Sequence, residues 1–234
     1  LRSGRFQPLV IQPYRGHGTH EVFYLKGRVL EGTGVTRSSS TDSTWQNIVN
    51  MYHRFTSHEM PGARVRAQVE DRTWEAVTDR EGYFSLRMRL PNIPDGSRIW
   101  NSVKLDLLEP RLPHHPPSHV IGHVLVPPPE AQFGIISDID DTIVKTEATS
   151  TLRMLRIVLL TNAHTRVPFE GVAAFYRALR RGASGCDANP IFYVSSSPWN
   201  LYDLLIDFMN VHGIPYGPLF LRDFGFDAEL ILSL

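Results

Sequence analysis

Alternating apolar and polar positions dominate residues 21–126 of the chain. The stretches Ala63–Glu70 and Phe84–Leu90 each place apolar residues at every second position, with charged or polar residues between them. A period of two is typical of strands that bury one face. Similar patterns predict further strands at Val22–Leu30, Val103–Leu107 and Val120–Val126. Several short strands at this spacing favour a small antiparallel β-sandwich.

Two other patterns interrupt these strands. Apolar residues repeat at helical spacing over Trp45–Phe55, which predicts an amphipathic helix packed on the sandwich. Thr78–Gly82 predicts a turn in which Gly82 has a positive φ. The stretch TDREGYF that contains this turn resembles transthyretin-like and carboxypeptidase-regulatory-like sandwiches, and the resemblance implies a hairpin with a structural role.

The pattern changes after the prolines at 127–129, which form a stiff linker. An apolar run at Ile191–Val194 lies between two helix candidates, Pro168–Arg181 and Pro198–His212. The alternation of strand and helix predicts a parallel α/β sheet with right-handed crossovers. The expected organisation is a lead-in at 1–20, the sandwich domain at 21–126, a proline-rich linker at 127–132 and an α/β domain at 133–234.

Composition narrows the class of protein. Lys+Arg and Asp+Glu both number 24, so no basic field points to nucleic acid. The single Cys186 excludes an internal disulfide framework, and no apolar run reaches the length of a membrane span. We expect a cytoplasmic protein with peripheral membrane contact. The histidines show no ligand spacing and are expected on surface loops: His17, His20, His114, His115 and His119.

The most specific chemistry lies in FGIISDIDDTIVKT, Phe133–Thr146. Its apolar start predicts a strand buried on both faces, which ends at Asp138, Asp140 and Asp141. Carboxylates at this end of a parallel strand lie where α/β sheets bind ligands, and their mutual repulsion calls for a cation. We expect a Mg²⁺ site with a carboxylate nucleophile; the alternative is a solvated acidic turn. The spacing DxDxT resembles the first motif of haloacid-dehalogenase-like (HAD-like) phosphatases.

Ser195–Ser197, here called the serine segment, follows the second predicted strand and precedes Pro198. Hydroxyl and free N–H groups at a strand-to-helix junction can bind phosphate. Ser197 is expected to cap the helix, and Ser195 to face the Asp138 strand. Ser196 is left open between these roles.

Taken together, SDIDDTIVKT, TRVPFEGVAAFYRAL, FYVSSSPWNLYDLLIDF and GPLFLRDFG resemble the catalytic domain of the actin-patch phosphatidate phosphatase family, and YRGHGT resembles the segment before it. The resemblance implies a HAD-like core that hydrolyses a phosphate monoester, phosphatidate being the substrate class, with Mg²⁺ as cofactor. Asp138 would be nucleophile and metal ligand. Asp140 would be the general acid and then base, and would also contact the metal. Thr142 would orient Asp140, and Ser195 with Ser196 would bind the phosphoryl group.

Such enzymes also use a lysine and a further acidic metal ligand, which we expect beyond Gly225 and outside the chain as written. The site, and with it the α/β domain, is therefore expected to be incomplete. Two other functions stay open: a HAD-type phosphatase for a soluble phosphoester, and an inactive interaction module whose sandwich binds partners. The sequence does not identify protein partners of the sandwich.

Overall fold

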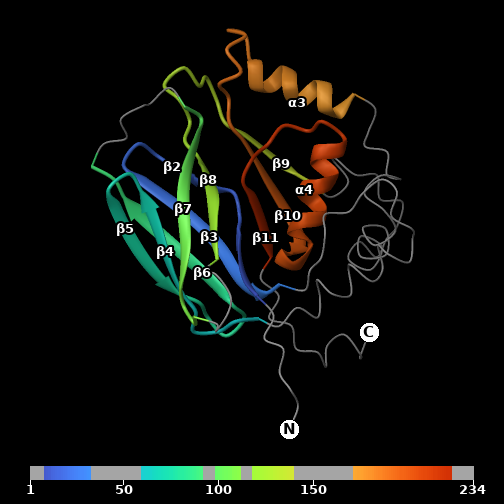
Figure 1. Cartoon of the computed structure of the whole chain (residues 1–234). Coiled ribbons are helices and arrows are strands. Elements are labelled where there is room, and N and C mark those ends of the chain that lie inside the picture. Colours follow the sequence, from blue (N-terminus) through green and yellow to red (C-terminus); the bar gives the residue numbers. More distant parts are fainter. Residues whose placement is uncertain (1–7, 33–58, 92–97, 112–117, 140–170, 223–234) are drawn as a thin grey trace, which may run out of the picture.

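The structure, a computed structural model, describes residues 8–32, 59–91, 98–111, 118–139 and 171–222. The predicted helix at Trp45–Phe55 lies outside these residues. So do two predicted site residues, Asp140 and Thr142. In the described part, an eight-stranded sheet lies beside a smaller parallel unit of strands and helices (Figure 1).

The eight-stranded sheet is mostly antiparallel. Its order is β1-β3-β2-β8-β7-β4-β5, with β6 paired to β3, and only β2 and β8 run parallel among these pairs. The strands are β1 (Leu9–Pro13), β2 (Gly16–Gly18), β3 (Val22–Glu31), β4 (Arg64–Val69), β5 (Arg72–Val77), β6 (Tyr83–Arg89), β7 (Trp100–Glu109) and β8 (His119–Leu125).

Every strand that alternation predicted in this half is present, with ends shifted by a few residues. The pattern works because one face is buried: Val65 and Ala67 on β4 are fully buried, and so are Val103 and Leu105 on β7. The three strands β1, β2 and β5 were not predicted. The side chains of β5 are partly or fully exposed, so burial imposes no apolar period on it.

The hairpin expected around Thr78–Gly82 is wrong. Gly82 does have a positive φ of 77°, but the turn joins β5 to β6, and these strands pair with different neighbours. The hairpin in this region is β4–β5, which turns at Glu70 with a φ of 52°. The turn at Thr78–Gly82 instead leads from β5 into β6, which pairs with β3.

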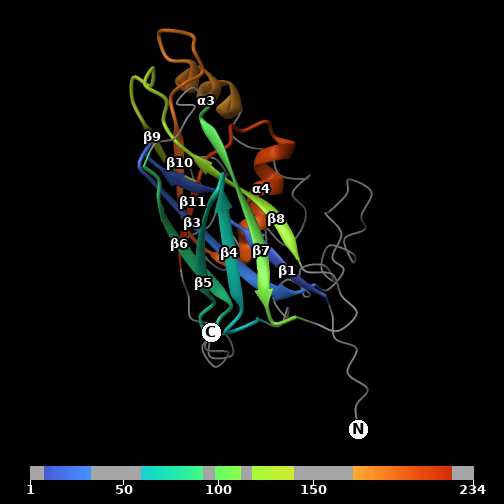
Figure 2. The ribbon, with the colours of Figure 1, turned by 60° about the vertical axis from the view of Figure 1, so that its left-hand side comes forward.

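The parallel unit is a three-stranded sheet of order β11-β10-β9 with helices α3 and α4 (Figures 1 and 2). Its strands are β9 (Ile135–Asp138), β10 (Ile191–Pro198) and β11 (Leu219–Arg222). Its helices are α3 (Val172–Arg181), the short 3₁₀ turn η1 (Trp199–Leu201) and α4 (Tyr202–Val211). The predicted strand–helix alternation and parallel pairing are present.

The helices fit their predicted apolar stripes in part. On α4, Leu205, Phe208 and Met209 are buried as expected, and Gly213 ends the helix region with a φ of 63°. On α3, Tyr176 is buried, whereas Phe175, placed on the inner stripe by its spacing, is 58% exposed.

The expectation that the first parallel strand is buried on both faces is also wrong for the described chain. Ile136 is 78% exposed, and Val194 of β10 and Phe220 of β11, which pair with each other, are 43% and 40% exposed. The opposite face carries Tyr193, Leu219 and Leu221, which pack with the helices in one core. The described residues therefore leave the side that carries Ile136 partly exposed.

Candidate active site

The two predicted motifs lie on neighbouring strands. β9 and β10 are parallel, with Ile135 opposite Ile191 and Asp138 opposite Val194. The pairing continues one step further, where the Ile139 N–H donates to the Val194 carbonyl at 3.1 Å. The carboxyl ends of both strands therefore meet at one edge, as the motif order predicted.

Asp138 is the last residue of β9, and its side chain is exposed. Within the described part of the chain it has no ion-pair partner. A carboxylate at this edge can attack an electrophile or bind a hard cation. Asp140 and Thr142 follow in sequence outside the described residues, so their roles rest on the motif alone.

The serine segment alternates between the two faces of the sheet. Ser195 and Ser197 are 7% and 0% exposed, whereas Ser196 between them is exposed. Val194 is exposed and stands opposite Asp138 in register, and Ser196 follows it by two positions. Strand alternation thus puts Ser196 on the face of Asp138 and puts Ser195 on the buried face.

Ser197 does not cap the following helix, which corrects the prediction. β10 runs through Ser197 to Pro198, η1 starts at Trp199, and no side chain caps it. Instead the Ser197 N–H donates to Ser195 Oγ at 3.0 Å. Ser197 Oγ is buried without a hydrogen-bond partner among the described residues. The extended backbone of an X-Pro step keeps Ser197 in the strand.

A buried polar contact that the sequence did not predict supports the end of β9. Ser137 Oγ is hydrogen-bonded to the Tyr176 hydroxyl of α3 and lies 2.9 Å from the Asp138 carbonyl oxygen. The Tyr176 ring meets Tyr193 of β10 edge-on at 6.1 Å, and burial raises the pKa of the Tyr193 hydroxyl. The Tyr193 phenol therefore stays neutral, and the Tyr176 hydroxyl serves as a hydrogen-bonding group behind Asp138.

The described chain contains no group of three or more His, Cys, Asp or Glu residues suited to a metal ion. This is consistent with the sequence, which places the other acidic residues of the motif at Asp140 and Asp141. His17, expected on a surface loop, lies instead on β2, half-buried between the rings of Tyr24 and Phe220.

A cavity of about 270 Å³ lies away from this edge. It is lined by the ends of α3 and α4, including Arg177, Arg181, Gly213 and Tyr216. These residues precede β10 and β11, so the cavity sits at the amino ends of the strands. It is not part of the candidate active site.

None of the helices in the described ranges is long and apolar enough to cross a membrane.

Comparisons with known proteins bear on the C-terminal segment. The family model described as "Phosphatidate phosphatase APP1, catalytic domain" matches residues 133–234. No curated protein matches the chain. A crystal structure titled as a protein of unknown function from Porphyromonas gingivalis W83 is similar with a TM-score of 0.25 and 11% identity, over 56% of this chain and 58% of that one. This chain thus spans just over half of that protein, and so distant a likeness carries no weight. The segment that this family model matches, residues 133–234, holds both motifs.

Proposed function

We propose that the protein is a phosphatase that hydrolyses the phosphate monoester of phosphatidate. The observation that carries the proposal is the meeting of Asp138 and the serine segment at one edge of a parallel sheet, inside a segment that matches the APP1 catalytic-domain model. The proposal includes a HAD-like core for this segment and a sandwich for the strands before it.

The proposed reaction has two displacements. A carboxylate oxygen of Asp138 attacks phosphorus, the P–O bond to the lipid breaks, and the leaving alkoxide takes a proton from Asp140 to give diacylglycerol. Water then attacks the phosphoaspartate and gives its proton to Asp140. This step releases inorganic phosphate and restores the Asp138 carboxylate.

The serine segment would bind the phosphoryl oxygens during both steps. Ser196 shares the face of Asp138, whereas Ser195 is buried and holds the turn of the segment through the Ser197 N–H. We therefore assign the direct hydroxyl contact with the phosphoryl oxygens to Ser196. Ser195 would contact these oxygens from the edge of β10. Thr142 would orient Asp140, as the motif implies.

The donor set at this edge fits Mg²⁺. Asp138 is an exposed carboxylate with no cationic partner among the described residues, and oxygen is the ligand type that Mg²⁺ requires. Asp138 and Asp140 would hold the ion, which when bound would offset the charge shared by nucleophile and phosphate. Without a cation, an anionic nucleophile and an anionic phosphate repel each other.

The test is phosphate release from phosphatidate in mixed micelles, compared with water-soluble phosphomonoesters, each with Mg²⁺ or with EDTA. The proposal predicts Mg²⁺-dependent release and a higher kcat/KM for phosphatidate. A preference for the soluble esters would favour a soluble-phosphoester phosphatase. Absence of release from every ester in Mg²⁺, from a chain extended to include the lysine and acidic ligand expected beyond Gly225, would favour an interaction module and contradict the proposal.

A further inference from the structure

The eight-stranded sheet contacts the parallel unit directly after the serine segment. Tyr14 lies between β1 and β2, is 2% exposed, and stacks on Trp199 with ring centroids 4.4 Å apart. Trp199 is the first residue of η1 and follows Pro198, the last residue of β10. The contact therefore falls on the part of the chain that leaves the candidate active site.

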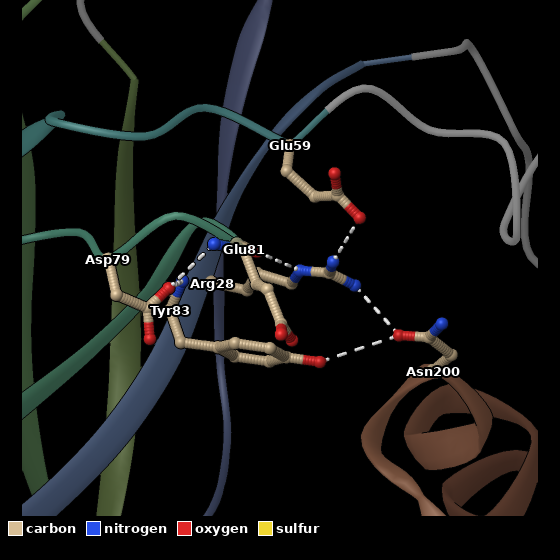
Figure 3. A network of polar contacts seen from close by, with 6 residues as sticks. All are labelled: Arg28, Glu59, Asp79, Glu81, Tyr83 and Asn200. Atoms are coloured by element: carbon tan, nitrogen blue, oxygen red, sulfur yellow. Dashed lines mark hydrogen bonds and ion pairs between the residues drawn. The ribbon is translucent and has the colours of Figure 1, made fainter. Parts of the chain in front are cut away.

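A buried arginine strengthens this contact (Figure 3). Arg28 of β3 is 5% exposed and directs its guanidinium at three acceptors. Its Nε donates to the Glu81 carbonyl at 2.8 Å, one terminal nitrogen to Glu59 Oε1 at 2.7 Å, and the other to Asn200 Oδ1 at 2.8 Å. Asn200 lies in η1, so this last bond joins the two halves.

The turn at Thr78–Gly82 forms the base of this network. The Asp79 carboxylate accepts the N–H groups of Glu81 and Tyr83, both at 2.9 Å. It thereby fixes the carbonyl that Arg28 binds and the Tyr83 ring, whose centroid lies 4.5 Å from the guanidinium carbon. The Tyr83 hydroxyl also donates to Asn200 Oδ1, at 3.4 Å. One oxygen of η1 thus accepts two donors from the eight-stranded sheet.

The serine segment itself lacks a regular ladder within the described chain. Pairing of β10 with β9 reaches Val194 opposite Asp138. Between β10 and β11, Val194 pairs with Phe220, and the next pair is Pro198 with Arg222. The chain therefore advances four positions along β10 but only two along β11. The residues between therefore form a β-bulge or a similar irregularity of β10.

From these observations we propose that Arg28 is a positioning residue for the serine segment. Val194 is held in the ladder at one end, and the Arg28–Asn200 bond holds the other end through η1. The eight-stranded sheet thereby sets where the phosphate-binding hydroxyls lie relative to Asp138. The inference rests on the proposed phosphatase function for its catalytic consequence, though not for the anchoring itself.

An arginine suits this task better than a lysine would. Its planar fork can hold the sheet and η1 in one fixed geometry, and burial removes competing water. A displacement of about 1 Å in a group that orients substrate can cost roughly 10² in rate. Loss of the anchor should therefore lower kcat far more than it weakens substrate binding.

The experiment compares Asn200→Ala, which removes the acceptor, with Asn200→Asp, which keeps an acceptor oxygen for Arg28. Val65→Ala, a truncation of a fully buried residue of β4, serves as a control for lost stability. Two readouts are measured for each variant: amide hydrogen exchange of the peptide 191–201, and kcat and KM for phosphate release.

We expect Asn200→Ala to speed exchange in this peptide about tenfold, the equivalent of one lost buried hydrogen bond, and to lower kcat by about 10–100-fold with KM within about threefold. Asn200→Asp should restore both readouts, and Val65→Ala should change neither. Unchanged exchange in Asn200→Ala would overturn the anchoring. Changed exchange with an unchanged kcat would overturn the positioning role. If the wild-type protein releases no phosphate, the proposed function fails, and the exchange data alone decide whether the anchor exists.

Discussion

The two sheets differ in how their cores are closed. In the described chain, the core of the eight-stranded sheet is built from residues of that half alone, between Leu9 and Val126. The core of the parallel unit contains two tyrosines from outside it, Tyr14 and Tyr83. The core of the eight-stranded sheet is thus self-contained, whereas the core of the parallel unit is completed by residues of the eight-stranded half.

The difference shows that the parallel unit shares its core with the strands before it. Gln12 of β1 donates to Asp203 of α4 at 2.6 Å, and the Arg15 N–H donates to the Tyr202 hydroxyl at 2.9 Å. Burial raises the pKa of Tyr202 to about 12, so this hydroxyl stays neutral at physiological pH. The eight-stranded sheet therefore acts as a support for α4 and for the strand end before it.

The largest effect should come from the chemistry assigned to the parallel unit. Asp138→Asn should abolish turnover, because an amide is a poor nucleophile and a poor Mg²⁺ ligand. Asp140→Asn should slow turnover by roughly 10²–10⁴, as expected for a lost general acid. The matched control is Asp187→Asn, the same change at an exposed residue of this unit that pairs with Arg180. Phosphate release measures all three, and an Asp138→Asn variant within tenfold of wild type would refute the assignment.

The next effect concerns Tyr14, which belongs to the eight-stranded half but packs in the core of the parallel unit. Tyr14→Ala should destabilise the protein by about 3–5 kcal/mol, the range for truncating a buried aromatic residue. Hydrogen exchange should show the loss in α4 and spare β7, because the core of the eight-stranded sheet does not include Tyr14. Val10→Ala, at a residue 41% exposed on β1, is the control and should have little effect. Equal loosening of α4 and β7 would mean that the two cores are not separate.

A smaller effect concerns pH and the contact between β2 and β11. Burial lowers the pKa of His17, so the folded protein takes up a proton less readily than the unfolded chain, whose histidine titrates near pH 6.5. The contribution of His17 to the free energy of unfolding should therefore be complete above about pH 6.5 and be lost as the pH falls through the folded pKa. His17→Phe should remove this contribution and keep the ring contacts with Tyr24 and Phe220. Denaturant unfolding from pH 7.5 to 5 measures how the free energy of unfolding changes with pH, and His20→Phe, at an exposed site, is the control. If the free energy of unfolding of His17→Phe depends on pH as steeply as that of the wild type, the prediction is wrong.

The sequence predicted what local pattern can specify. Alternation located β3, β4, β6, β7 and β8, and the order of the motifs predicted that β9 and β10 are neighbours. It missed β5, whose side chains are partly or fully exposed, and it misplaced the partner of β6, because strand pairing depends on contacts far apart in the chain.

The candidate site divides in the same way. Asp138 and the serine segment were readable from strand ends and spacing. Ser197 was misassigned because a serine before a proline is compatible with either a helix cap or a strand end. The Arg28–Asn200 bond joins residues 172 positions apart, and no local pattern marks either of them. YRGHGT and TDREGYF resemble motifs of known families, but their contacts with η1 depend on the three-dimensional fold.

The most direct test of the account is to trap the covalent intermediate. The protein is mixed with phosphatidate carrying ³²P in its phosphate group in the presence of Mg²⁺, quenched in acid, and digested to locate the label. We expect a hydroxylamine-sensitive acyl phosphate on the peptide that contains Asp138, and no label in Asp138→Asn. Label on Ser195, Ser196 or another residue, or rapid turnover with no trapped label under any quench, would contradict it.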